Sequence, residues 1–364
     1  MTRPRARDVG VVVGALPTGP LNAITDVAGV RVGHATIVEG DEVRTGVTVV
    51  EPHEGEIWAD PVFAGPHRLN GNGELTGLEW IRESGFLTSP VALTNTHSVG
   101  VVRDALIGAE IARRPADVEF WALPVVGETW DGLLNDINGM HVRGEHVDEA
   151  LASAADGPVR EGNVGSGTGM ICHGFKGGIG TSSRVAEAAG GAIVGVLVQA
   201  NHGRRERLSI NGVAVGAALR GDDVPLPGGV DLAGGGSIIV VVATDAPLLP
   251  LQCARLAQRA GLGIARLGGV GENFSGDLFL AFATGNRGLP AGDYGGSSDL
   301  TATVRMLSDR YITHLFDAVV EATEEAIVNA LFAAETMDGH RGSRVHELPV
   351  DRVVELLGAR SALG

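Results

Sequence analysis

The chain has 364 residues, a formal net charge of −16 at neutral pH and 44% hydrophobic residues. The acidic balance disfavours nucleic acid and anionic membranes as partners, because both bind to concentrated basic surfaces. The apolar residues are spread along the whole chain, which excludes a disordered protein. Two cysteines, Cys172 and Cys253, are too few for a disulfide framework and form no C-x-x-C pair, so zinc and redox motifs of that kind are absent.

In chain order, the predicted elements are strands at 90–94 and 195–199, a loop at 221–236, a strand at 237–244, a helix at 248–262, a strand at 278–283, a turn-rich loop at 285–298 and a helix at 314–334. Strands and helices do not alternate strictly, so an α/β sandwich suits the pattern better than a doubly wound parallel sheet. There is no internal repeat and no interdomain linker, which predicts one domain over residues 1–364.

The apolar runs also indicate where in the cell the protein is expected. The N-terminus is basic, but the apolar run at 11–16 is short and no small-residue cleavage site follows it. No later stretch reaches the roughly 18 apolar residues that a membrane-spanning helix needs. We therefore expect a soluble, cytoplasmic protein.

One serine, Ser275, stands at a glycine-bracketed bend directly before the predicted strand at 278–283. A serine hydroxyl needs a general base to become a nucleophile, but no histidine lies within a few residues and no G-x-S-x-G motif is present. Cleavage of the preceding peptide bond would supply a base, because a free α-amine has an ordinary pKa of roughly 7.7 to 8. The alternative is that Ser275 lies in an ordinary turn.

The segment around this serine, Asn-Phe-Ser-Gly-Asp-Leu-Phe-Leu-Ala-Phe at 273–282, resembles the processing site of the L-aminopeptidase/D-esterase and β-peptidyl aminopeptidase family. Other segments resemble family blocks in the same order along nearly the whole chain, at 24–34, 70–74, 93–100, 128–139, 162–173, 175–181, 198–203 and 242–247. The resemblance implies a four-layer αββα sandwich with an N-terminal serine nucleophile. It also implies cleavage into fragments 1–274 and 275–364, which stay associated and form a homo-oligomer of fragment pairs.

The resemblance implies an activity as well. The Ser275 hydroxyl would attack the Phe274 carbonyl, and the freed amine would then act as general base in an aminopeptidase, amidase or esterase that releases N-terminal residues. Phe274 departs from the family pattern, because a small or polar residue often precedes the serine there. Its bulky side chain must fit the cleft, or processing will be slow.

Three residues match supporting positions of the family. Asn201 follows the predicted strand at 195–199 and matches the oxyanion-hole asparagine, whereas the sequence without the resemblance favours an Asx turn before Gly203. Thr323 and Glu325 match a hydroxyl residue and a glutamate that support the nucleophile and its amine. Residues two apart on a regular helix point about 200° from each other, so both would reach the site only at an irregular turn.

Other residues suggest a substrate pocket without settling it. Trp130, beside Glu128 and Asn135, is expected either to line the pocket or to pack in the core. Asp277, two residues after the predicted nucleophile, could bind a substrate amine, but capping of the turn is the favoured interpretation.

No cofactor and no metal are expected. The glycine-rich segments 162–169 and 177–180 lack the phosphate-loop and dinucleotide patterns. His97, His173 and His202 are scattered and lack the i,i+4 spacing of metal ligands. A Schiff-base role for Lys176, the only lysine, is not favoured.

Two other functions stay open. The first is an acyltransferase of related fold, although that group usually presents threonine as the nucleophile. The second is a non-enzymatic scaffold or binding protein that kept the fold and lost processing. The substrate also stays open between an α-peptide, a β-peptide, a D-amino acid ester and an amide, because pocket shape decides it.

Overall fold

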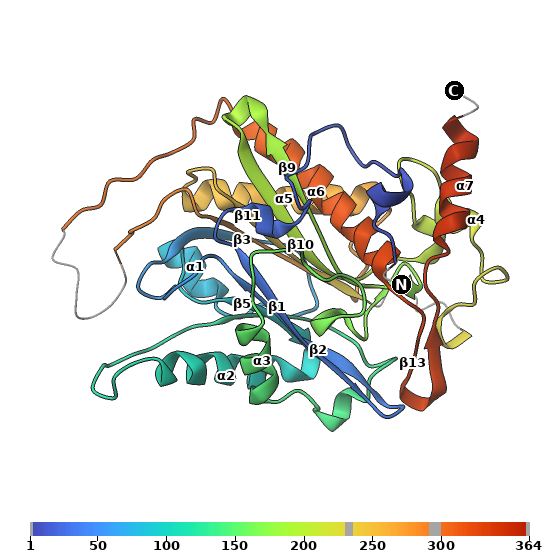
Figure 1. Ribbon diagram of the computed structural model, residues 1–364, viewed down its shortest axis with the longest axis horizontal. Coiled ribbons are helices and arrows are strands. Elements are labelled where there is room, and N and C mark those ends of the chain that lie inside the picture. Colours follow the sequence, from blue (N-terminus) through green and yellow to red (C-terminus); the bar gives the residue numbers. More distant parts are fainter. Residues whose placement is uncertain (1–2, 230–235, 291–299, 362–364) are drawn as a thin grey trace.

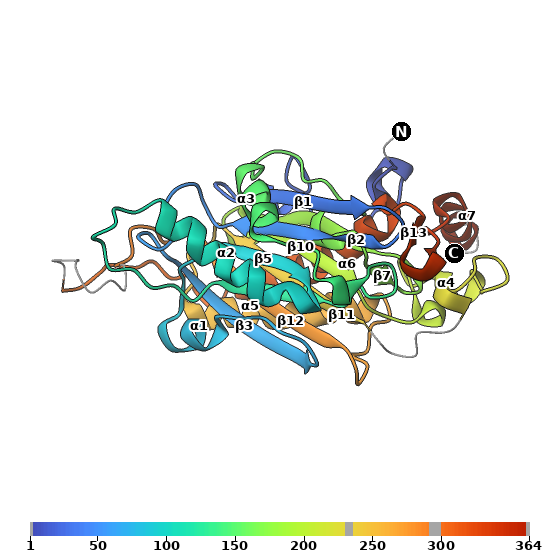
Figure 2. The ribbon, with the colours of Figure 1, turned by 90° about the horizontal axis from the view of Figure 1, so that it is seen from below.

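Two β-sheets lie face to face in the middle of the molecule, and helices cover the outer face of each sheet (Figure 1). The computed structural model describes residues 3–229, 236–290 and 300–361. The view from below shows α2 and α3 lying across the strands of one sheet, while α5 and α6 lie behind the other (Figure 2). The arrangement is a four-layer αββα sandwich, as expected.

The strands divide into one sheet of four and one of six. The smaller sheet has the order β1 (Arg31–Glu39), β2 (Val43–Glu51), β5 (Val91–Asn95), β6 (Val125–Thr129). The larger has the order β4 (Phe86–Leu87), β3 (Val62–Gly71), β12 (Gly276–Ala283), β11 (Ser237–Thr244), β10 (Ala192–Asn201), β9 (Gly178–Ala186). Two small hairpins pair β7 (Ile171–Cys172) with β8 (Phe175–Lys176) and β13 (Met337–Gly339) with β14 (Ser343–Val345).

The helices are α1 (Leu78–Ser84), α2 (Val99–Ala112), α3 (Gly144–Ala152), α4 (Val215–Ala218), α5 (Pro250–Arg266), α6 (Ile312–Ala333) and α7 (Val350–Ser361). Helix α5 connects the parallel strands β11 and β12, and α2 connects the parallel strands β5 and β6. Each is a β-α-β crossover, so each helix lies on its own sheet's outer face.

Alternation of side chains along β11 explains why the layers form. Ile238 and Val240 pack into the core under α5 and α6, whereas Ile239 and Val241 pack into the core between the sheets. Successive strand side chains point to opposite faces, and all four are fully buried. A strand that is apolar at every position is therefore what a sheet covered on both sides requires.

Helix α6 lies unusually close to its sheet. A Cβ atom added to Gly180 in β9 would lie 1.9 Å from the carbonyl oxygen of Ala326 in α6, so only glycine allows this approach. The N-terminal segment packs into the same hydrophobic core as this helix through Ala6, Val11 and Val13. Helix α6 is consequently buried on nearly every side over 322–332.

The predicted elements are present with small shifts at their ends. The strand at 237–244 has the predicted bounds, the strands at 90–94, 195–199 and 278–283 are β5, β10 and β12, and the helices at 248–262 and 314–334 are α5 and α6. The loops at 221–236 and 285–298 contain no strand where they are described, while 230–235 and 291–298 lie outside the described residues. None of the described helices combines the length and apolar character needed to cross a membrane.

Candidate active site

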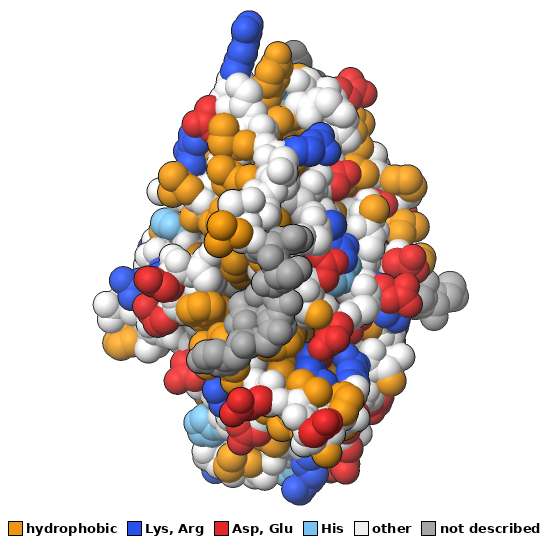
Figure 3. All heavy atoms as spheres, turned by 90° about the vertical axis from the view of Figure 1, so that its left-hand side faces the viewer, with side chains coloured by type: hydrophobic (Ala, Val, Ile, Leu, Met, Phe, Trp, Pro, Cys, Tyr) orange, Lys and Arg blue, Asp and Glu red, His pale blue; other side chains and the backbone are white. Residues whose placement is uncertain are grey.

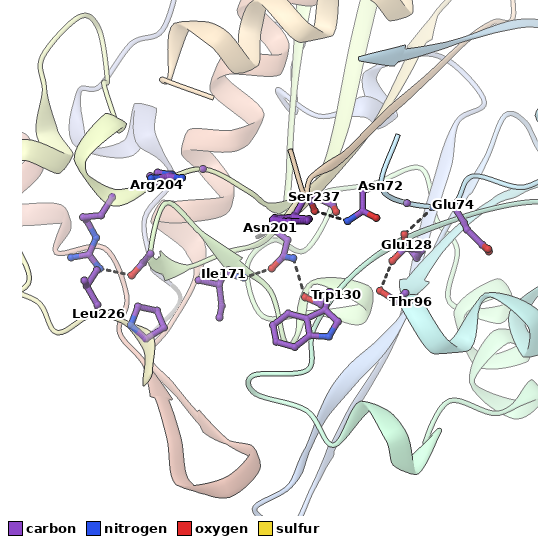
Figure 4. A pocket seen from close by; sticks show the side chains of 17 residues that line it. Asn72, Glu74, Thr96, Glu128, Trp130, Ile171, Asn201, Arg204, Leu226 and Ser237 are labelled. Atoms are coloured by element: carbon purple, nitrogen blue, oxygen red, sulfur yellow. Dashed lines mark hydrogen bonds between the residues drawn. The ribbon is translucent and has the colours of Figure 1, made fainter. Parts of the chain in front are cut away.

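A cavity of about 640 Å³ opens where β10 ends and β11 begins. Its wall also includes the end of β6 and the hairpin of β7 and β8 (Figure 4). The residues that line it are Asn72, Gly73, Glu74, Thr96, Glu128, Trp130, Ile171, Gly174, Asn201, Gly203, Arg204, Arg205, Leu226, Pro227, Gly236, Ser237 and Phe274. Five of the residues named from the sequence are among them: Asn201, Glu128, Trp130, Gly203 and Phe274.

Ser237 is the serine that lines the cavity. It is the first residue of β11, and the strand register places it opposite Asn201 of β10. Its Oγ accepts a hydrogen bond from the Gly276 N–H of β12 at 3.0 Å, which leaves its own proton available to a base. The preceding residue, Gly236, has φ of +144°, a conformation that favours glycine.

Sequence reasoning treated Ser237 only as the start of a strand. The signal that could have identified it is the run Gly-Gly-Gly at 234–236 directly before it. A small residue before the serine is the family pattern from which Phe274 departs.

Ser275 lies one strand away, directly before β12. Its side chain is buried and does not line the cavity, and its hydroxyl donates to Asp277 Oδ1 at 2.5 Å. Burial raises the pKa of Asp277 to about 6, although the hydrogen bond from Ser275 opposes that shift. The Asp277 carboxylate thus fixes the orientation of the Ser275 hydroxyl. Phe274, by contrast, is 65% exposed and borders the cavity.

Asn201 is held in one orientation by two backbone groups. Its Oδ1 accepts from the Ile171 N–H at 2.7 Å, and its Nδ2 donates to the Trp130 carbonyl at 2.9 Å (Figure 4). One N–H of the amide is therefore used, and no residue in the described part of the chain accepts from the second. The residue is nearly buried and borders the cavity next to Ser237. An amide so placed can donate to an oxyanion.

Glu128 brings a carboxylate to the cavity from the end of β6. Its side chain is 3% exposed and accepts hydrogen bonds from the Glu74 N–H at 2.9 Å and from the Thr96 hydroxyl. Burial raises its pKa, and the bond from Thr96 opposes the shift. Trp130, which is 45% exposed, lines the cavity beside it. Both residues border the cavity, as a residue that contacts substrate would have to do.

Asn135 does not border the cavity. Its Oδ1 accepts from the Arg44 N–H and its Nδ2 donates to Asp131, both at 3.1 Å. It is buried and joins the loop after β6 to β2. The expectation that Asn135 contacts substrate is corrected accordingly, because sequence proximity to Trp130 does not place its side chain on the same surface.

Thr323 and Glu325 are also absent from the cavity wall. Both are fully buried in α6. Glu325 pairs with Arg184 at 2.6 Å and with Arg7 at 2.7 Å, and it accepts from Asn22. Burial alone would raise its pKa, but the hydrogen bond from Arg7 and the charge of Arg184 hold the pKa below its ordinary value. The carboxylate neutralises the buried Arg184 and the partly exposed Arg7, which corrects its expected role beside the nucleophile.

Among the residues that the structure describes, one group of side chains could hold a metal ion. Cys172, His173 and His202 each offer a ligand atom, and these atoms lie within 4.8 Å of one another. The structure thus brings together two histidines that sequence spacing left apart. All three are buried and none lines the cavity. Burial also raises the pKa of Cys172 to about 12.

Comparison with known proteins agrees with this fold. The family described as peptidase family S58 matches residues 22–345. β-Peptidyl aminopeptidase BapA of Sphingosinicella microcystinivorans is 48% identical over 367 residues, covering 95% of this chain and 90% of that protein. BapA of Sphingosinicella xenopeptidilytica is 44% identical over 375 residues, covering 98% and 92%.

Solved structures give the same result. A β-aminopeptidase from Burkholderia sp. superimposes with a TM-score of 0.92 and 56% identity, covering 98% of this chain and 99% of that one. The L-aminopeptidase D-Ala-esterase/amidase of Ochrobactrum anthropi, a variant of the Ntn hydrolase fold, has a TM-score of 0.89 and 43% identity over 100% of both chains. The acyltransferase and scaffold alternatives are not supported by these matches. The chain belongs to peptidase family S58 and is a hydrolase of the serine aminopeptidase type with the Ntn hydrolase fold.

Proposed function

We propose that this enzyme is activated by its own cleavage between Gly236 and Ser237, and that Ser237 is its nucleophile. The observation that carries the proposal is the place of Ser237 in the cavity, opposite Asn201 and within 3.0 Å of the Gly276 N–H. The single domain over 1–364 would then mature into fragments 1–236 and 237–364. This replaces the division after Phe274 that the sequence suggested.

Two further observations favour Ser237 over Ser275. The residue before Ser237 is glycine, which fits a crowded attack geometry, whereas Phe274 is bulky. The hydroxyl of Ser275 is already donated to Asp277, while that of Ser237 accepts from the Gly276 N–H and donates to no residue that the structure describes. A nucleophile must pass its proton to a base, so the free hydroxyl is the better candidate.

One contact favours Ser275 as the nucleophile instead. The Asn72 side chain donates from Nδ2 to the Phe274 carbonyl oxygen at 2.8 Å, and this carbonyl is the one that Ser275 would attack. Cleavage after Phe274 therefore remains the second candidate, with Asn72 as its oxyanion donor. The position of the new N-terminus separates the two candidates.

Activation follows from the chemistry of an acyl shift. The Ser237 Oγ adds to the Gly236 carbonyl, the C–N bond breaks, and the acyl group passes to oxygen as the nitrogen takes up the proton. Water then hydrolyses the ester and returns the hydroxyl. The product has a free α-amine on Ser237 with an ordinary pKa of roughly 7.7 to 8, so it can act as base near neutral pH.

Hydrolysis of a substrate follows the same steps as self-cleavage. The amine takes the Ser237 Oγ proton while Oγ attacks the scissile carbonyl, and it returns the proton to the leaving amine. An N–H of Asn201 donates to the oxyanion. Water hydrolyses the acyl-enzyme. The hydrogen-bonded Ser275 and Asp277 lie on the adjoining strand, where the register pairs Ile238 with Asp277, and we assign them to orienting the new amine.

The test is the cleavage position in purified wild-type protein. Intact mass under denaturing conditions and N-terminal sequencing should find fragments 1–236 and 237–364, the second beginning Ser-Ile-Ile-Val. A second fragment beginning Ser-Gly-Asp-Leu would instead establish Ser275 as the nucleophile. A chain that stays intact after long incubation would contradict self-processing at either serine.

For the substrate we propose a peptide whose N-terminal residue is a β-amino acid. Support comes from the relatives at 48% and 44% identity, which are named β-peptidyl aminopeptidases. Glu128 supplies the group that would bind the substrate ammonium, because it is a nearly buried carboxylate on the wall of the cavity.

Replacing Glu128 by Gln tests this role. A hydrogen bond to a charged group contributes about 1.5–3 kcal/mol, so kcat/KM for a substrate with a free amine should fall by about 10- to 100-fold. Hydrolysis of the same substrate with its amine acetylated should not fall. Glu74→Gln is the matched control, since Glu74 lines the same cavity but is exposed. An equal loss in both variants would contradict recognition by Glu128.

We also propose a homo-oligomer of fragment pairs. The segment 300–311 extends from the body of the molecule (Figure 1), and Leu300 and Met306 are 99% and 58% exposed. Hydrophobic side chains lie beside the residues drawn in grey on this face (Figure 3). Light scattering of the processed enzyme measures its mass, and a single fragment pair would contradict the proposal. The cytoplasmic location stays a prediction.

A further inference from the structure

Lys176 is a buried cation that the proposed reaction does not use. Its side chain is fully buried, and no described carboxylate forms an ion pair with it. Its Nζ donates instead to the carbonyls of Gly167 at 3.1 Å, Met170 at 2.9 Å and Gly177 at 2.9 Å. Burial lowers the pKa of Lys176 to about 7, because removing an ammonium from water disfavours its charged form.

The three carbonyls lie on a segment that borders the cavity at Ile171 and Gly174, although Gly167, Met170 and Gly177 do not line it themselves. They lie on the segment from the 3₁₀ turn Gly165–Gly167 to β9, and this segment includes the hairpin of β7 and β8. Ile171, at the start of β7, lines the cavity directly. The ammonium therefore joins three points of one loop that has little regular secondary structure to hold it.

One peptide group connects Lys176 to Asn201. The carbonyl of the Met170–Ile171 peptide accepts from Lys176 Nζ and from the Gly177 N–H, each at 2.9 Å. The N–H of the same peptide donates to Asn201 Oδ1 at 2.7 Å. A peptide group is planar and rigid, so fixing its carbonyl also fixes the direction of its N–H. A cation on the carbonyl also polarises the peptide and strengthens its N–H as a donor.

The orientation of Asn201 depends on this N–H. With Oδ1 bound to Ile171, Nδ2 faces the Trp130 carbonyl at 2.9 Å and keeps one N–H for the cavity. The flipped carboxamide would set Oδ1 against the Trp130 carbonyl and Nδ2 against the Ile171 N–H, so both contacts would be repulsive. Losing the Ile171 N–H would remove one of the two contacts that prevent this flip.

We propose that Lys176 is a positioning residue for the hydrolytic reaction: its ammonium holds the Met170–Ile171 peptide so that Asn201 presents N–H groups, not oxygen, to the oxyanion. The inference rests on the proposed role of Asn201. It explains why a cation without a carboxylate partner is buried here. It also connects the glycine-rich segment 162–169 to the reaction, because the Gly167 carbonyl is one of the three that bind the Lys176 ammonium.

A double-mutant cycle tests the coupling. Lys176→Met, Asn201→Ala and the double variant are made in the full chain, and the rate of self-cleavage is followed by intact mass together with turnover of an aminoacyl p-nitroanilide that the wild type hydrolyses. Loss of one oxyanion donor typically costs about 10²–10³-fold in kcat, and we expect Lys176→Met to lower kcat by about 10- to 100-fold with KM changed less than about threefold. In the Asn201→Ala background the same substitution should cost less than about threefold.

Two further variants separate positioning from general stability. Lys176→Arg keeps a cation with several donors and should recover most of the lost kcat. Arg205→Met removes a second buried cation that donates to nearby carbonyls, those of His173 and Gly174. Because Arg205 does not bind the Met170–Ile171 peptide, its effect should add to that of Asn201→Ala.

If Lys176→Met yields no folded protein, Lys176→Gln takes its place, since it keeps two N–H donors without the charge.

Equal losses from Lys176→Met with and without Asn201 would overturn the inference, because they would show a purely structural role. An unchanged kcat in Lys176→Met would overturn it as well. An unchanged kcat in Asn201→Ala would be a different failure, since it would remove the oxyanion role of Asn201 from the proposed function and with it the basis for positioning by Lys176.

Discussion

The Ser237→Ala variant is expected to stay a single uncleaved chain and to lose turnover by about 10⁶-fold, the cost typical of removing a serine nucleophile. The physical reason is that alanine removes both the attacking oxygen and any route to the free amine that serves as its base. Denaturing intact mass measures the first effect, and p-nitroanilide release measures the second. The side chain is small and at the start of β11, so thermal unfolding should change little.

Ser275→Ala is the matched control for this prediction. It removes the hydroxyl that donates to Asp277 at 2.5 Å but leaves Ser237 intact. We expect cleavage before Ser237 to continue, with turnover lowered by about 10- to 100-fold, the range of one hydrogen bond to a charged group. The reverse pattern, in which Ser275→Ala stays intact and Ser237→Ala is cleaved, would assign the nucleophile to Ser275.

Asn201→Ala is expected to lower kcat by about 10²–10³-fold, the typical cost of losing one oxyanion donor, while KM changes little. The donor acts on charge that develops only in the transition state, so substrate binding should be nearly unaffected. Self-cleavage passes through the same kind of oxyanion and should slow in parallel. Initial rates over a range of substrate concentrations separate kcat from KM.

Asn72→Ala is the control for Asn201. Asn72 also lines the cavity and donates a side-chain amide hydrogen bond, but to the Phe274 carbonyl. If Ser237 is the nucleophile, this substitution should leave the cleavage rate within about threefold, because that carbonyl takes no part in the reaction. A loss that matches Asn201→Ala would instead point to the Phe274 carbonyl as the one attacked.

Much of the fold follows from local patterns. The apolar run at 237–244 predicted a strand with the bounds that β11 has, because a strand covered on both faces is apolar at every position. The helical spacing at 248–262 and 314–334 likewise predicted α5 and α6. The strand β2 was missed, since its 43–51 run contains Arg44, Thr45 and Thr48, which are buried without being apolar.

Helix α6 shows that a local sequence pattern does not predict the tertiary partners of a side chain. Periodicity showed that Thr323 and Glu325 point in different directions, but it could not say what each would meet. In the folded chain Glu325 meets Arg7 and Arg184, one from the N-terminal segment and one from β9. Those partners lie 318 and 141 residues away along the chain, so no sequence window contains them.

The order of the motifs along the sequence indicated the family, and the hydrophobic pattern indicated an α/β sandwich, because both are properties of the chain in one dimension. The four-layer αββα arrangement and the expected role of Asn201 followed from the resemblance, and Glu128 and Trp130 were candidates for the pocket. Only the tertiary structure decided which serine faces the cavity. The order β10-β11-β12 sets Asn201, Ser237 and Gly276 side by side. Strand pairing joins residues far apart in the chain, and the sequence pattern of a strand does not specify its neighbours.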